Sequence, residues 1–285
     1  MNIPSTTRLK IALLALLLTM AMAIEATAQL ASTGLAPDVG GTRTVDVKSD
    51  APDPFRVGEQ LDYSITLGRM RLGTATMTVE EKEPMGGVLA YRTSLHVDIG
   101  AAILRYEDRL VSWIEPVPLR SRAFMRRDAG SEKRFRHHAF DPEGRRVTVE
   151  LRSPDGRVLA ELGETGPIAT NALDELAALY FLRSMSLADG ETRTLHRYFD
   201  PAADLMQVTR LGTRRIRVPA GRFEAVVYRV VIPALPAFQA DRDARIYLSD
   251  DDQRLIVQIE TDLKIGRLVM YLTDHGILDG HAESP

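Results

Sequence analysis

The sequence predicts an all-β, mainly antiparallel protein whose curved sheet forms an open or closed barrel with one long amphipathic helix packed against it. Three observations indicate this class. Alternation of apolar and polar residues recurs along most of the chain after position 55, turn signals separate the alternating segments, and one segment has helical periodicity. Strands and helices do not alternate along the chain, which disfavours a doubly wound parallel sheet.

The first residues have the composition of an export signal. Arg8 and Lys10 precede an apolar run of roughly 14 residues, and the small residues at 26–28 offer a cleavage site. The run is short for a membrane span, which needs about 20 residues. We therefore expect residues 1–28 to be a cleaved signal peptide and the protein to be periplasmic, with a retained membrane anchor as the alternative.

Composition sets the domain organisation. Residues 29–54 are rich in Gly, Pro, Ser, Thr and Asp, which is typical of a flexible linker. A single antiparallel β domain is expected over 55–275 and a disordered tail over 276–285. Cysteine is absent, so the exported fold has no disulfide and must be held by burial. With 36 basic and 39 acidic residues, the formal net charge of −3 argues against a nucleic-acid partner.

Residues 55–81 predict the first hairpin. Gly68 can supply the positive φ of a tight reversal, and "PMGG" at 84–87 turns the chain again. The apolar side chains that alternate with polar ones along the arms are Leu61, Tyr63, Ile65, Leu67, Ala75, Met77, Val79, Tyr91, Leu95 and Val97. Further strands are expected at about 103–114, 119–127, 132–140, 146–161, 192–199, 205–211, 213–218, 223–232, 244–249, 254–262 and 267–273.

One segment predicts a helix, at about 171–188. Asn171 is a natural N-cap, the first turn is acidic, and Gly190 can end the element. Its apolar stripe is formed by Leu173, Leu176, Ala177, Tyr180 and Phe181. We expect this stripe to pack on the sheet.

Motifs of catalysis are scarce. The chain has no G-x-S-x-G elbow, no phosphate-binding glycine loop and no H-E-x-x-H. His137 and His138 point to opposite faces of a strand, so they cannot share a metal, and their arginine neighbours predict surface residues. The aspartates at 250–252 lack the spacing of an EF-hand and are interpreted as turn formers. Glu107, Asp108 and Arg109 alternate between faces, which favours cross-strand ion pairs over an acid/base pair. No enzyme activity, cofactor or metal is expected.

Basic residues are concentrated between positions 120 and 157, where 11 Lys and Arg stand against 6 Asp and Glu. A solvated strand face is one interpretation. The other is a surface that contacts anionic lipid through Arg126, Arg134 and Arg136, with peripheral membrane contact at most.

Several motifs together resemble the bacterial Domain of Unknown Function 3108 family. They are the opening "FRVGEQLDY", the helix "DELAALYFLRSMSLADGE", the turn and strand "VPAGRFEAVVYRV" and the closing hairpin "DDDQRLIVQIETDLKIGRLVMYL". The resemblance covers about Phe55 to Leu272 and implies an exported or envelope protein with a largely antiparallel sheet, without catalytic residues to transfer. Gln253 stands where this family commonly has glycine, which leaves the turn type open.

Many strands and one helix must enclose an interior. If part of it stays open, it can shelter an apolar, lipid-like envelope molecule. The residues expected to line that space are Tyr63, Ile65, Leu67, Tyr91, Leu95, Leu255 and Val257. If side chains fill it, the protein is a packed scaffold or adaptor that docks an envelope protein, and the same residues are core. Hydrolysis of an envelope polymer is a third hypothesis, which no converging acid/base pair supports.

Overall fold

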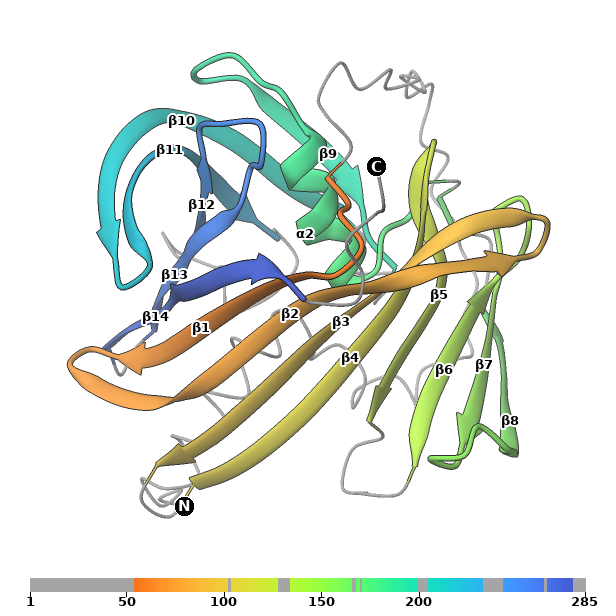
Figure 1. The fold of residues 1–285 in the computed structure, drawn as a ribbon. Helices are drawn as coiled ribbons and strands as arrows, with labels where there is room; N and C mark the ends of the chain where they lie inside the picture. The colour runs from red at the N-terminus through yellow and green to blue at the C-terminus, as the bar shows by residue number, and fades with distance from the viewer. Residues whose placement is uncertain are drawn as a thin grey trace, which may run out of the picture.

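The computed structural model describes residues 54–101, 104–127, 134–165, 168–169, 171–198, 205–232, 243–263 and 266–278. The predicted signal peptide lies outside these residues, as does the predicted linker apart from Pro54. The described chain forms one sheet of fourteen strands and one helix, α2 (Glu175–Ser184) (Figure 1). No helix in this described part is long and apolar enough to cross a bilayer.

The strands are short to medium in length and follow one another in antiparallel hairpins. Their bounds are β1 (Glu59–Leu67), β2 (Met70–Met85), β3 (Val88–Ala101), β4 (Leu104–Pro116), β5 (Leu119–Arg127), β6 (Phe135–Phe140), β7 (Val147–Arg152), β8 (Val158–Thr165), β9 (Thr192–His196), β10 (Leu205–Val218), β11 (Gly221–Val231), β12 (Ala244–Ser249), β13 (Ile256–Leu263) and β14 (Gly266–Ile277).

The order of the strands makes the sheet open. It runs β8-β7-β6-β5-β4-β3-β2-β1-β14-β13-β12-β11-β10-β9, so the first and last strands pair in its middle. The two edges, β8 and β9, are the strands that flank α2 in the sequence and do not pair with each other. The fold is therefore barrel-like but not closed, which decides between the two predicted forms.

The first hairpin has the predicted geometry. Burial alternates strictly along β1, and Gly68 has φ +58° at the reversal into β2. At Gly73 a side chain is impossible for another reason, because a Cβ there would lie 2.0 Å from the carbonyl oxygen of Asp98 on β3. Three boundaries differ from the prediction. The strand expected at 146–161 is divided into β7 and β8, β10 is one strand with a register shift between Arg210 and Gly212, and β14 continues to Ile277, past the expected start of the tail.

The helix is shorter than predicted and is not amphipathic. It has ten residues, of which nine are buried, so other parts of the chain cover it on nearly every side. Asp174, not Asn171, is the N-cap, because Leu173 is held by backbone bonds to His196 and Tyr198 beside β9. The helix ends at Met185, where the backbone becomes extended, well before Gly190.

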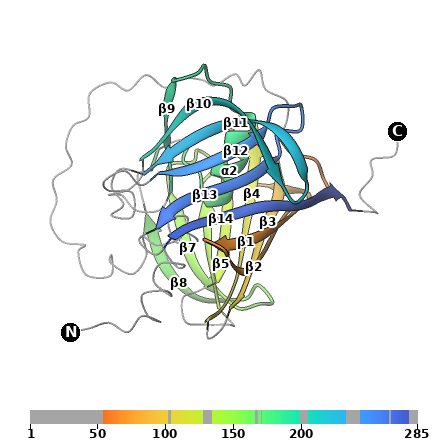
Figure 2. The ribbon, with the colours of Figure 1, turned by 90° about the vertical axis from the view of Figure 1, so that its left-hand side faces the viewer.

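The helix lies inside the curve of the sheet. It packs against β3, β4 and β5 on one side, and β9 to β14 wrap around the other (Figures 1 and 2). The β10–β11 hairpin bends back far enough for Ala220 N to donate to Leu272 O on β14, at 3.0 Å. We call α2 with β1–β4 and β9–β14 the helix half, and β6–β8 the wing; β5 lies between them.

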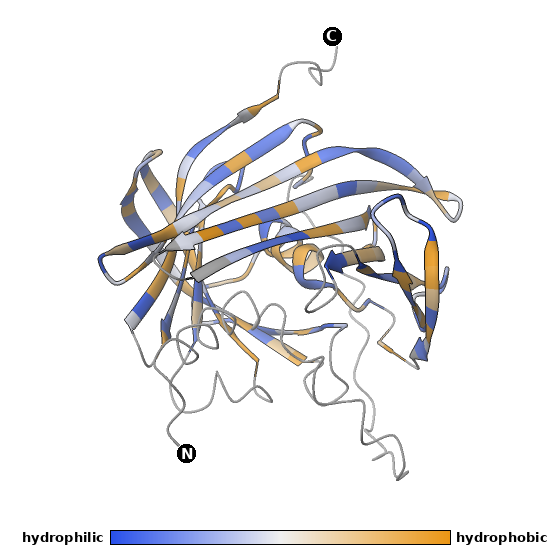
Figure 3. Cartoon of the chain, turned by 90° about the horizontal axis from the view of Figure 1, so that it is seen from below, coloured by the Kyte–Doolittle hydropathy of each residue, from blue (hydrophilic) through white to orange (hydrophobic). Residues whose placement is uncertain are grey.

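The core is continuous and fills the helix half, and it extends through Phe124 on β5 to Phe140 on β6 and Val147 on β7. Apolar and polar residues alternate along its strands (Figure 3). All seven residues expected to line a ligand space belong to this core: Tyr63, Ile65, Leu67, Tyr91, Leu95, Leu255 and Val257, with exposed fractions between 0% and 9%.

The outer face of the sheet carries the charged residues. Glu107 and Arg109 are exposed there and Asp108 is buried, as their alternation predicts. Arg109 pairs with Glu80 at 2.9 Å, and Glu80 also pairs with Arg92 at 2.9 Å. Glu107, 4.0 Å from Arg127, and Arg109 thus serve ion pairing between strands, whereas Asp108 accepts hydrogen bonds on the other face.

Candidate functional site

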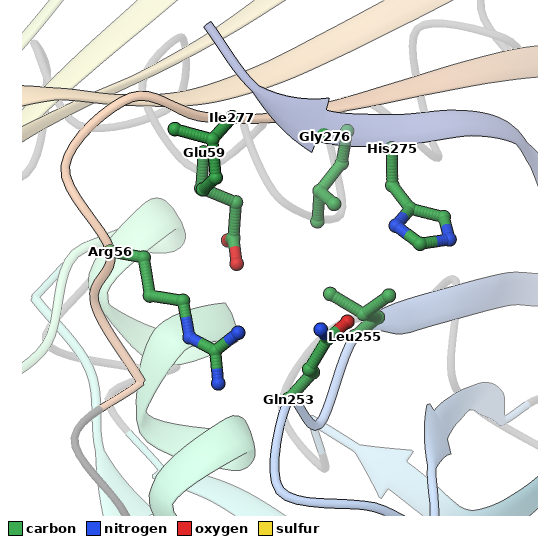
Figure 4. A pocket seen from close by; sticks show the side chains of 8 residues that line it. Arg56, Glu59, Gln253, Leu255, His275, Gly276 and Ile277 are labelled. Atoms are coloured by element: carbon green, nitrogen blue, oxygen red, sulfur yellow. The ribbon is translucent and has the colours of Figure 1, made fainter. Parts of the chain in front are cut away.

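A small hollow lies where the chain enters β1. Its volume is about 60 Å³, and it is lined by Arg56, Glu59, Leu61, Gln253, Leu255, His275, Gly276 and Ile277 (Figure 4). Pockets for small molecules usually enclose about 300–1,000 Å³. The hollow is thus far smaller than a small-molecule pocket, with room for water and not for an acyl chain.

Beneath the hollow lies a buried ion pair, Glu59–Arg183. Arg183 is 1% exposed, and its Nη1 and Nη2 donate to the two oxygens of Glu59 at 2.5 and 2.9 Å. Its Nε and Nη2 also donate to the carbonyl oxygens of Arg254 and Gln253. This network fastens the end of α2 to β1 and to the β12–β13 turn, which is a structural role.

The conformation of the β12–β13 turn, which the sequence left open at Gln253, is set by Asp251. Asp251 Oδ1 accepts hydrogen bonds from Ser249 Oγ and from the backbone N–H groups of Gln253 and Arg254. The positive φ falls on Arg254, at 47°, whose side chain caps the helix by donating to the carbonyls of Arg183 and Met185. An aspartate side chain therefore organises this turn, as the interpretation of residues 250–252 predicts.

A second polar group lies at the other end of α2. Asp174, fully buried, accepts from the N–H groups of Leu176 and Ala177, both at 2.9 Å. Its other oxygen accepts from Ser112 Oγ at 2.6 Å, and its backbone N–H donates to Ser121 Oγ. Burial raises the pKa of Asp174, an effect that these hydrogen bonds oppose. The carboxylate is thus saturated by its role as a cap.

Glu175, the next residue, is in a different situation. It is 2% exposed, and neither of its carboxylate oxygens makes a hydrogen bond. Arg126 Nη1 lies 4.0 Å from Oε1, and the buried Arg197 also acts on it electrostatically. Burial raises the pKa of Glu175 well above its ordinary value, while Arg126 lowers it. A buried carboxylate with no donor is unusual and calls for a physical explanation.

The prediction that His137 and His138 are surface residues was wrong. Both are buried, at 9% and 7% exposure, because Trp113 packs on the ring of His137 and Phe124 and Tyr198 pack on that of His138. Burial lowers the pKa of His137 to about 4 and that of His138 to about 3, with nearby arginines acting in the same direction. Both rings are therefore neutral at ordinary pH.

The three arginines expected on an outer anionic-lipid surface lie in different places. Arg126 has a side chain 12% exposed beside Glu175, so it does not belong to an outer face. Arg136 is half-buried directly opposite Arg126 on the neighbouring strand, and Arg134 is exposed just before β6. We call Arg126, Arg136, His138, Glu175 and Arg197 the inner cluster.

The acidic side chains near α2 do not converge on one point. Within the described ranges no three His, Asp or Glu residues gather as a metal site would require. Asp174 and Glu175 are adjacent in the sequence. Hydrogen bonds occupy the carboxylate of Asp174, whereas the carboxylate of Glu175 faces arginines. The two carboxylates therefore do not flank a common substrate position.

A family model matches residues 62–273, described as a protein of unknown function, DUF3108. The chain belongs to the DUF3108 family. The sequence resemblance is therefore correct, and it covers the sheet from β1 to β14, including the helix and the inner cluster. No curated protein matches this DUF3108 chain.

Three solved structures similar to this DUF3108 protein each share 10% sequence identity with it. A β-barrel-like protein of the DUF1849 family from Brucella abortus has a TM-score of 0.46, over 78% of this chain and 98% of its own. A protein described as exported, with a YmcC-like fold, from Bacteroides fragilis has 0.30 over 79% and 99%. One described as a lipoprotein, from Parabacteroides distasonis, has 0.31 over 80% and 100%.

Sequence reasoning missed Glu175 and Arg197 in this DUF3108 protein, and a signal for Glu175 was present. Leu179 and Leu182 lie on the same helix face as Glu175 and are as apolar as the stripe assigned to the opposite face. A helix that is apolar on both faces is a buried helix. A glutamate in its first turn is then a buried charge, which marks it as a position to examine.

Proposed function

We propose that the protein is a non-enzymatic envelope protein that binds an apolar, lipid-like molecule on the inner face of β5 and the wing. The observation that carries this proposal is the composition of that face, which combines the cationic groups of Arg126 and Arg136 with apolar side chains that the core does not fully cover. The proposal does not place the ligand in the helix half, because α2 and buried side chains occupy the space inside that part of the sheet.

Strand register supports the placement of these side chains. The ring of His138 contacts that of the core residue Phe124, so His138 points inward. Arg136 lies two residues from His138 and therefore on the same face. Paired residues of antiparallel strands share a face, so Val149 opposite His138, and Leu151 opposite Arg136, also point inward. Both are half-buried.

Burial supplies the binding energy in this proposal. Apolar surface removed from water contributes about 25 cal/mol per Å², and no covalent step is needed. The cationic groups at the rim of the apolar strip orient a polar head. The envelope location rests on the composition of residues 1–28, and the DUF3108 family is compatible with it.

Native mass spectrometry of the protein purified from the periplasm tests the proposal. We expect lipid-sized adducts on the wild type and their loss in Leu151→Glu, because a charge on the inner face opposes a hydrocarbon chain. Leu89→Glu is the matched control, since Leu89 is 61% exposed. A wild type without adducts, also after incubation with a bacterial lipid extract, contradicts the proposal.

A second candidate function, docking of an envelope protein, is favoured by strand β8. Val158, Leu159 and Leu162 are 45%, 44% and 49% exposed on this edge strand. Two register shifts interrupt the β7–β8 pairing, so Leu159 and Leu162 have no direct partner on β7. Such irregularities hinder the addition of another strand, so contact would be through side chains. A photo-crosslinking residue at position 162 should then capture one defined protein that the same residue at 89 does not.

A further inference from the structure

We infer that Glu175 is the acceptor for the head group of the bound amphiphile, and that this head carries both an oxyanion and an N–H donor, as phosphoethanolamine does. This inference rests on the proposed function and names the class of ligand that the same face takes.

The first step is the contrast among the buried carboxylates near α2. Asp174 is saturated by the helix N-terminus and Ser112, as described above. Asp108, 8% exposed on β4, accepts from Tyr106 Oη and from the N–H of Arg109, both at 2.9 Å. Glu175 is more deeply buried than Asp108 but accepts no hydrogen bond. Its two oxygens are therefore acceptors that a ligand with a donor can use.

The second step is the distribution of charge around Glu175. Arg126 Nη1 lies 4.0 Å from Glu175 Oε1, which is too far for a hydrogen bond. Arg136 on β6 is paired directly with Arg126 on β5. Arg197 contributes a third positive charge on the side of β9. A simple carboxylate or phosphate could bind these guanidinium groups, but it would repel Glu175 and leave its oxygens without donors.

A head with both charges meets both needs. Its oxyanion accepts from the arginines, and its ammonium donates to Glu175, so neither ionic group of the ligand is left without a partner on burial. Arginine side chains are long and change rotamer easily, so they can move to admit the head. The acyl chain then extends along Val149 and Leu151 on the inner face of the wing.

Two probes of equal charge and equal tail test the donor. Oleoyl lysophosphatidylethanolamine has three N–H donors, and oleoyl lysophosphatidylcholine has none. We expect the wild-type protein, titrated below the critical micelle concentration, to bind the ethanolamine lipid about tenfold more tightly, as one charge-assisted hydrogen bond predicts. Equal affinities for the two lipids overturn the inference and leave the proposed function standing, whereas no binding of either lipid overturns both.

Variants separate hydrogen bonding from the smaller size of the ethanolamine head. Glu175→Gln should reduce the tenfold preference to about twofold, since a neutral acceptor forms the weaker bond. Glu175→Asp retracts the carboxylate but keeps its charge beside the arginines, so it serves if the glutamine variant fails to fold, and it should reduce the preference as well. Asp108→Asn is the control and should keep the tenfold preference for the ethanolamine lipid. Arg126→Gln should weaken the binding of both lipids by the same factor. A preference that survives in both Glu175 variants overturns the inference.

Discussion

Strands β13 and β8 each have eight residues and similar apolar patterns, but their environments are opposite. Ile256, Val257 and Ile259 on β13 are at most 8% exposed. Every side chain of β8 from Val158 to Glu164 is exposed. Ile256 and Val257 are adjacent and point to opposite faces, so both faces of β13 are covered, whereas neither face of the edge strand β8 is. Burial in this protein therefore follows the place of a strand in the fold more than its residue pattern.

The largest expected effect is at the ion pair that holds the helix in its half. Arg183→Met leaves the carboxylate of Glu59 buried without its partner and should lower the free energy of unfolding by about 3–5 kcal/mol. Denaturant titration measures it. Adding Glu59→Gln should recover part of the loss, since the buried charge is then removed. A loss below 1 kcal/mol would show that the helix does not depend on this pair.

Apolar truncation sharpens the comparison directly. Leu176 on α2 is 1% exposed. Replacing it with alanine should lower the free energy of unfolding by about 2–5 kcal/mol, because a cavity remains in the packed helix half. Leu162→Ala on β8 should change the free energy of unfolding by at most about 0.5 kcal/mol, since the side chain is already in water. Equal costs from denaturant titration would contradict the contrast between the packed helix half and the exposed edge strand β8.

The smallest effect concerns Glu175, where the two regions meet. Burial raises the pKa of Glu175, so the folded protein binds a proton on this carboxyl group more tightly than the unfolded chain does. Its contribution to stability is thus present at low pH and is lost as pH rises above the ordinary glutamate pKa of about 4.3. The stability of Glu175→Gln relative to wild type should therefore increase between pH 4 and pH 8. A difference independent of pH would contradict the raised pKa.

Most strands could be predicted because their signals are local. Alternation at Leu61, Tyr63 and Ile65 and the glycine at 68 act within a few residues, and the structure has them as expected. The helix was predicted in place but not in length, since its start depends on Leu173 pairing beside β9, a contact that no local pattern encodes. The histidines were misassigned for a similar reason: their neighbours in sequence are arginines, but their neighbours in space are aromatic rings.

The candidate site depended still more on distant contacts. Arg126 and Arg136 were singled out from the basic composition of their segment, but Glu175 and Arg197 join them only through folding. In the sequence, the whole wing lies between the helix and β5, the strand that contains Arg126. The seven residues predicted to line a ligand space, taken from alternation along several strands, are core side chains and do not include the inner cluster.

The amino-acid sequence by itself determined an antiparallel β protein with one helix, its turns and its membership of the DUF3108 family, since period and turn chemistry are properties of adjacent residues. Only the tertiary structure decided that the sheet stays open, that the helix fills one half of it, and that a buried carboxylate meets arginines at its end. These features depend on which surfaces cover one another, and burial, not residue type, sets the energy of a charge or an apolar side chain.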